Sequence, residues 1–115
     1  MVSCATSQKP TVSGKKANKA TAMSALEATN FEENYYNGIK AKLIDNDVNK
    51  SIGYFEKCIS INGQNAGALF ELARLYMDQK KFPDAEKLLE KATQLDPQNK
   101  WYILALIETY SQQSN

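Results

Sequence analysis

A string of oxygen-bearing side chains in the middle of the chain imitates a calcium-binding loop. Oxygens at alternate positions, with a glutamate at the twelfth, are the pattern that wraps Ca²⁺, and here they belong to Asp45, Asp47, Asn49, Ser51 and Glu56. The sixth position of such a loop needs glycine for a sharp turn, whereas this sequence has Lys50, whose ammonium group repels a cation. We therefore predict no metal site, and we expect Asp47 to cap the helix that follows.

The other residues with catalytic chemistry are absent or have a structural explanation. The sequence contains no histidine, so it lacks the commonest general base and metal ligand, and no Ser-His-Asp set can form. Glu32 and Glu33 are expected in the first turn of a helix, where the helix dipole favours acids. Cys58 is expected as a small buried residue, and no glycine-rich phosphate loop is present. The sequence therefore predicts neither an enzyme nor a cofactor.

Cys4 suggests a modification. The segment Ser3-Cys4-Ala5-Thr6-Ser7, followed by a polar stretch, resembles the mature start of a bacterial lipoprotein. In that family the cysteine carries a lipid that tethers a soluble domain to a membrane. Residues 1–3 contain no apolar signal segment, and no run approaches the ~18 apolar residues of a membrane span. Cys4 is therefore either a lipidation site, which implies the bacterial cell envelope, or an ordinary free thiol of a cytoplasmic protein.

The charges are unevenly distributed along the chain. Residues 1–29 carry four lysines against one glutamate, a net charge of +3, and the rest carries 10 basic and 12 acidic residues, a net charge of −2. A nucleic-acid surface needs a concentrated basic face, which a mildly acidic body does not offer. We predict that residues 1–29 form a flexible basic tail, with a short helix around residues 21–29, and that residues 30–115 form the folded domain.

From residue 32 onward the sequence repeats with a period of 34 residues. Residues 32–65 align with residues 66–99 without a gap, and a partial third unit covers residues 100–115. Leu69, Leu72, Ala73 and Tyr76 have the i, i+3, i+4, i+7 spacing of one helix face. Polar breaks and Pro83 separate the apolar stretches. The pattern predicts helices at roughly 32–45, 48–61, 66–79, 82–95 and 99–112.

This period and its residues resemble the tetratricopeptide repeat (TPR) family. The second unit matches the family pattern with Leu72-Ala73, Tyr76, Ala85, Leu89, Ala92 and Pro97. The first unit departs from it with Gly38-Ile39, Ser51, Cys58 and Gly63. The resemblance covers residues 32–112. It implies an all-α fold, a right-handed superhelix of antiparallel helix pairs with about two and a half repeats.

The resemblance also implies a function, because the first helix of each family unit lines a concave groove that grips a peptide or a helix. Carried over to this sequence, the groove residues are Glu33, Tyr36, Asn37, Lys40 and Leu43, then Gly67, Phe70, Glu71, Arg74 and Met77, then Trp101, Leu104, Ala105 and Glu108. The alternative interpretation is that Tyr36, Phe70 and Leu104 are plain inter-helix core. One subfamily clamps the terminal carboxylate of chaperones, but here only Lys40 fits that clamp and Glu71 would repel a carboxylate, so no such binding is expected.

The last predicted helix is apolar on every side. Trp101–Ile107 forms an uninterrupted apolar run, which expects neighbours on more than one face. Two explanations stay open. The chain is the N-terminal part of a longer array, or the segment Trp101–Tyr110 packs against another copy. The second explanation makes the domain a structural oligomerisation module rather than a groove for a foreign protein.

Overall fold

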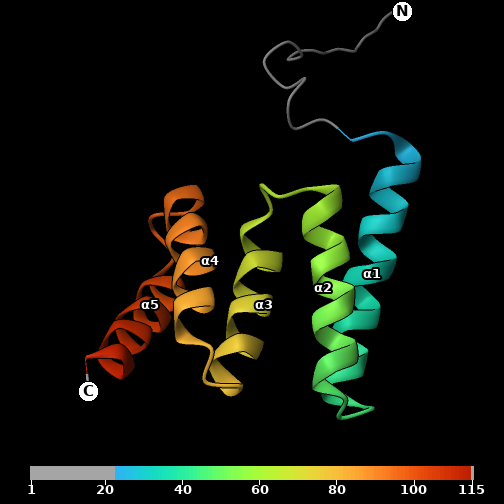
Figure 1. The fold of residues 1–115 in the computed structure, drawn as a ribbon. Helices are drawn as coiled ribbons and strands as arrows, with labels where there is room; N and C mark the ends of the chain where they lie inside the picture. The colour runs from blue at the N-terminus through green and yellow to red at the C-terminus, as the bar shows by residue number, and fades with distance from the viewer. Residues whose placement is uncertain (1–22, 115) are drawn as a thin grey trace, which may run out of the picture.

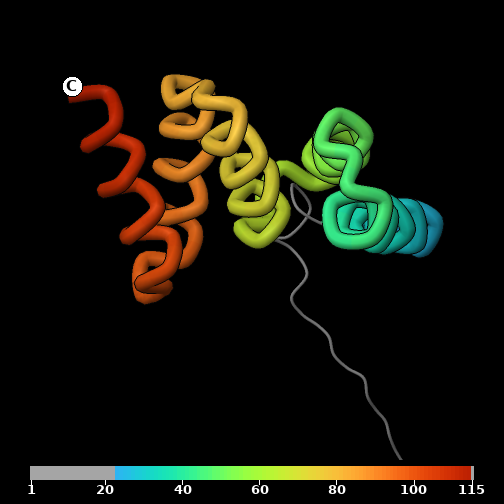
Figure 2. Tube along the Cα trace, turned by 90° about the horizontal axis from the view of Figure 1, so that it is seen from below, coloured from blue at the N-terminus to red at the C-terminus, as the bar shows by residue number. Residues whose placement is uncertain are grey.

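Five helices stand side by side in chain order in the computed structural model, which describes residues 23–114. They are α1 (Ala25–Leu43), α2 (Val48–Ile61), α3 (Ala66–Asp78), α4 (Phe82–Leu95) and α5 (Lys100–Gln113). The chain reverses direction at each short connection, and α1 and α5 lie at opposite ends of the row (Figure 1). The view turned by 90° shows the same order (Figure 2). The predicted all-α fold of consecutive helix pairs is confirmed.

Helices α2 to α5 begin and end within one residue of their predicted bounds, whereas α1 does not. It begins at Ala25, so the short helix expected around residues 21–29 is instead the start of α1. The boundary drawn between residues 29 and 30 falls inside this helix. Residues 1–22, where most of the predicted tail and Cys4 lie, are outside the described residues.

The early start of α1 has a cap and an anchor. The Ser24 hydroxyl accepts a hydrogen bond from the Glu27 amide, and the Glu27 carboxylate accepts one from the Ser24 amide, each at 3.1 Å. This reciprocal capping box satisfies two backbone donors. One turn further on, Phe31 is buried in the core. The spacing Ser24-x-x-Glu27 is a sequence signal of a helix start, and it marks this one.

The later helices begin at caps that recur with the repeat. Asp47 accepts from the Lys50 amide at 3.0 Å, as predicted, and Asn65 accepts from the Ala68 amide at 2.9 Å. The turns between paired helices also match, because Asn46 and Lys80 lie 34 residues apart and both adopt a left-handed backbone, with φ of 54° and 61°. The two units therefore repeat in conformation as well as in sequence.

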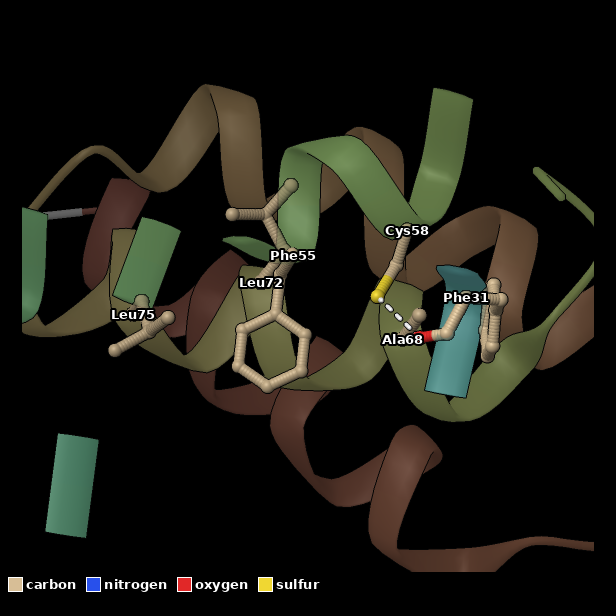
Figure 3. Packing of buried hydrophobic residues seen from close by; sticks show 6 residues of the cluster. All are labelled: Phe31, Phe55, Cys58, Ala68, Leu72 and Leu75. Atoms are coloured by element: carbon tan, nitrogen blue, oxygen red, sulfur yellow. Dashed lines mark hydrogen bonds between the residues drawn. The ribbon is translucent and has the colours of Figure 1, made fainter. Parts of the chain in front are cut away.

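Two buried clusters hold the row together. The first contains Phe31, Phe55, Cys58, Ala68, Leu72 and Leu75, from α1, α2 and α3 (Figure 3). In it the Cys58 thiol donates to the Phe31 carbonyl at 3.5 Å. The second contains Ala73, Ala85, Leu89 and Ala105, from α3, α4 and α5. Each cluster spans a unit boundary, so each helix pair depends on the next to cover its apolar side.

A polar contact also recurs at each boundary between units. The Tyr76 hydroxyl on α3 donates to the Glu56 carboxylate on α2 at 2.9 Å. Thirty-four residues later, the Tyr110 hydroxyl on α5 donates to the Glu90 carboxylate on α4, also at 2.9 Å. The geometry by which one unit meets the next is therefore reproduced along the chain.

Candidate functional site

A cavity of about 360 Å³ opens between α3 and α5, next to the start of α4. Its size falls within the range of ligand pockets, ~300–1,000 Å³. It is lined by Phe70, Arg74, Met77, Asp78, Lys80, Phe82, Trp101, Leu104, Ala105, Glu108 and Gln112. We call these residues the α3–α5 pocket. Residues from two helices of different units therefore share one concave site.

The pocket brings together six of the groove residues in the second and third units. They are Phe70, Arg74, Met77, Trp101, Leu104 and Glu108. Sequence reasoning missed Asp78, Lys80, Phe82 and Gln112. Gln112 follows Glu108 by four residues, so helix periodicity could have placed it on the same face. Lys80 and Phe82 lie at the turn between α3 and α4, whose left-handed conformation the sequence does not specify.

The apolar part of the pocket is largely open to solvent. Trp101 is 64% exposed and Leu104 is 53% exposed, and outside the pocket Tyr36 is 66% exposed. These values exclude the alternative that Tyr36 and Leu104 are plain core. Phe70 is half-buried and packs against Tyr102, with ring centroids 4.9 Å apart. Phe70 thus forms a fixed surface beneath more mobile apolar side chains.

The charged groups of the pocket balance one another. Arg74 and Lys80 are basic, and Asp78 and Glu108 are acidic. Ion pairs among the described residues join Lys40 to Asp45 and Lys42 to Glu71, so none of these four pocket charges is in one. The Arg74 guanidinium lies 5.6 Å from the centroid of the Phe70 ring, within cation–π range. All four charges are available to a charged ligand.

The groove residues predicted in the first unit lie elsewhere. Tyr36, Asn37 and Lys40 do not line the pocket, and Lys40 pairs with Asp45 at 3.3 Å. Glu71 is also absent from the lining. Its carboxylate binds Lys42 across the boundary between α1 and α3 at 2.7 Å.

Burial and the Glu71 carboxylate act together on a neighbouring tyrosine. Desolvation, and then the charge of Glu71, raise the pKa of Tyr35 to about 12. The region between α1 and α3 is therefore occupied by internal contacts of the protein. The open pocket lies at the next boundary, between α3 and α5.

Outside the pocket, the reactive groups singled out in the sequence have structural partners. Cys58 is fully buried, and burial raises the pKa of its thiol to about 11, so it stays protonated near neutral pH. Asp47 caps α2 and Asp45 pairs with Lys40. Within residues 23–114, no three His, Cys, Asp or Glu side chains lie close enough together to hold a metal ion. Among the described helices, none is sufficiently long and apolar to cross a membrane.

Comparison with known families places the fold. The family model for the tetratricopeptide repeat matches residues 42–107, more than half of the chain. The chain belongs to the tetratricopeptide repeat family. The match to the TPR model starts near the end of α1 and ends within α5. It leaves out most of the helix in which Gly38-Ile39 departs from the family pattern. A search of curated proteins found no match.

TPR membership sets the general role. Tetratricopeptide repeats are generally protein–protein interaction modules, and they are typically scaffolds rather than enzymes. The α3–α5 pocket lies on the first helices of two TPR units.

Proposed function

We propose that the chain binds a peptide or a helix of another protein in the α3–α5 pocket. The observation that carries this proposal is that six residues chosen by repeat position, on two different helices, line one cavity. Fold membership alone does not identify a binding site, so the argument rests on the lining itself.

The composition of the lining favours a polypeptide. Exposed Trp101 and Leu104 offer apolar area, and Arg74 and Glu108 offer opposite charges on either side. Tryptophan and arginine are enriched among the residues that carry protein–protein binding energy. The net charge of −2 over residues 30–115 disfavours a nucleic acid as the ligand.

The test starts from peptides selected against the purified chain from a display library. Arg74→Glu and Trp101→Ala should each weaken binding of the selected peptides by about tenfold or more, which corresponds to about 1.4 kcal/mol or more. Lys40→Glu is the matched control, because it reverses a charge at the equivalent repeat position outside the pocket. Isothermal titration calorimetry measures all three affinities. Unchanged affinity in both pocket variants would refute the proposal.

A second candidate function is self-association, in which the domain binds only other copies of itself. Helix α5 favours it, because its apolar side chains are broadly exposed and include Trp101, Ile103, Leu104, Ile107 and Tyr110. Charge reversal at Arg74 separates the two candidates. It should abolish binding of a foreign peptide and leave self-association intact.

A lipid on Cys4 is a further, independent proposal, and this residue lies outside the described part of the chain. The modification would tether the groove at a bacterial cell envelope. Mass spectrometry of the protein isolated from membranes would detect the acyl chains on Cys4. Protein recovered only from the soluble fraction, with an unmodified Cys4, would refute this proposal.

A further inference from the structure

The side of α5 that faces away from the pocket is built as a helix-packing surface. Ile103, Ile107 and Tyr110, here called the outer stripe, follow Leu69, Ala73 and Tyr76 by 34 residues. On α3 the first two of these positions are buried against α4, where Leu69 meets Ala92, and Ala73 meets Ala85 and Leu89. On α5 the outer stripe is 37%, 56% and 43% exposed.

The outer stripe is separate from the α3–α5 pocket. Trp101, Leu104 and Glu108 line the pocket, and none of the three outer-stripe residues does. An α-helix turns by about 100° per residue, which places the two sets on different sides of α5. A partner on the outer stripe therefore leaves the pocket open.

A helix like α4 does not fit this surface. Ala73 is fully buried beside Ala85, so that α3 and α4 approach closely at small side chains. Ile107 stands at the equivalent position of α5. Because interaxial distance depends on the side chains at the contact, this larger residue requires a partner helix that packs further away with interdigitating side chains.

The spacing of the outer stripe suits such a partner. Residues 103, 107, 110 and 114 follow one another by four, three and four, the spacing of a coiled-coil seam. The pattern is close to symmetric about Ile107, so an antiparallel copy of α5 presents nearly the same surface. This self-complementarity is what a two-fold contact requires.

Charge also permits the helix to meet its own copy. The charged residues of α5 are Lys100 and Glu108, and Glu108 faces the pocket. The neighbouring acids on α4, Glu86 and Glu90, are hydrogen-bonded to Gln113 and Tyr110. Two copies of the outer stripe can therefore meet without placing like charges opposite each other.

We propose that the outer stripe binds a second copy of this chain through an antiparallel contact between the two α5 helices, centred on Ile107. This inference makes the second candidate function specific, and it lets the dimer coexist with peptide binding. A stable interface buries ~800 Å² on each partner, more than one 14-residue helix offers. The dimer is therefore weak, with a dissociation constant on the order of 10–100 µM.

Sedimentation velocity over a range of protein concentrations tests the contact. The sedimentation coefficient of the unmodified chain rises with concentration, and Ile107→Asp removes the rise. Leu104→Asp is the matched control, because Leu104 is as exposed as Ile107, at 53% against 56%, and lies on the pocket side. That variant keeps the rise. A monomer at all concentrations, or equal loss in both variants, overturns the proposal.

A disulfide tests the geometry without introducing a charge. In a Cys4→Ser background, Ile107→Cys forms a cross-linked dimer under mild oxidation, because the two copies of residue 107 face each other. Leu104→Cys cross-links far more slowly, and equal rates overturn the proposal. Peptide binding separates this result from the proposed function, because Ile107→Asp retains it and Leu104→Asp weakens it.

Discussion

At the scale of single residues, the departures of the first unit from the family pattern compensate one another. Gly38 stands where the second unit has Leu72, and Phe55 stands where it has Leu89. The Phe55 ring fills the space that the missing side chain leaves, since a Cβ placed on Gly38 would lie 2.7 Å from it. The Ser51 hydroxyl then donates to the Gly38 carbonyl at 2.7 Å. Total volume is preserved while its distribution changes.

This exchange predicts opposite effects of one substitution at two glycines. Gly38→Ala should destabilise the fold by about 1–3 kcal/mol, because the new methyl group overpacks a fully buried ring. Gly53→Ala is the matched control, with no atom within 4 Å of its added Cβ. It should stabilise α2 by about 0.5–1 kcal/mol. Urea unfolding followed by circular dichroism measures both, and two effects of the same sign would contradict the packing.

A second residue-scale prediction concerns alkaline pH. Burial raises the pKa of Cys58 from 9.0 to about 11, so the folded state favours the neutral thiol. Its contribution to stability is complete below pH 9 and is lost as the pH rises from 9 to about 11. Tyr35 and Tyr76, raised by burial from 10.0 to about 12, extend the loss up to pH 12.

Cys58→Ala isolates the thiol, since alanine occupies the equivalent position 92. The urea midpoint of this variant should stay level until about pH 10, whereas that of the unmodified chain should fall from pH 9. Parallel curves for the two proteins would show that the thiolate does not drive the early loss.

At the scale of helices, the apolar period predicts α2 to α5 because each has a polar break or proline before it and a cap at its start. The first helix escapes this reasoning. Its opening turns expose Leu26 and bury Phe31 alone, so they show little periodic pattern. The candidate site follows the same division. Residues on helix faces are predictable from repeat position, whereas Lys80 and Phe82 depend on the path of a turn.

The contact between α1 and α3 gives an element-scale prediction. Lys42 and Glu71 are 30% and 20% exposed and lie 2.7 Å apart, whereas Lys40 and Asp45 are 42% and 30% exposed and lie 3.3 Å apart. A double-mutant cycle with Lys42→Met and Glu71→Gln should give a coupling of about 1 kcal/mol. The cycle with Lys40→Met and Asp45→Asn should give about 0.2–0.5 kcal/mol. Equal coupling would mean that the first pair does not join the units.

At the scale of the whole molecule, the helices should open in an order set by their neighbours. Stability in a repeat array is close to a sum over units and their nearest-neighbour contacts. Helix α3 packs against both α2 and α4, whereas α5 packs against the α3–α4 side alone. Hydrogen exchange with mass spectrometry, at concentrations where the chain is monomeric, should show faster exchange in α5 than in α3. Slower exchange in α5 would contradict this order.

The repeated contacts Tyr76–Glu56 and Tyr110–Glu90 make the seam between units interchangeable. Asn65 and Asn99 cap the helices that follow these seams in the same way, so a duplicate of residues 66–99 inserted after Asn99 finds a matching edge on both sides. The protein thus carries its own building block, and a tandem duplication of that segment lengthens the row while keeping every existing junction.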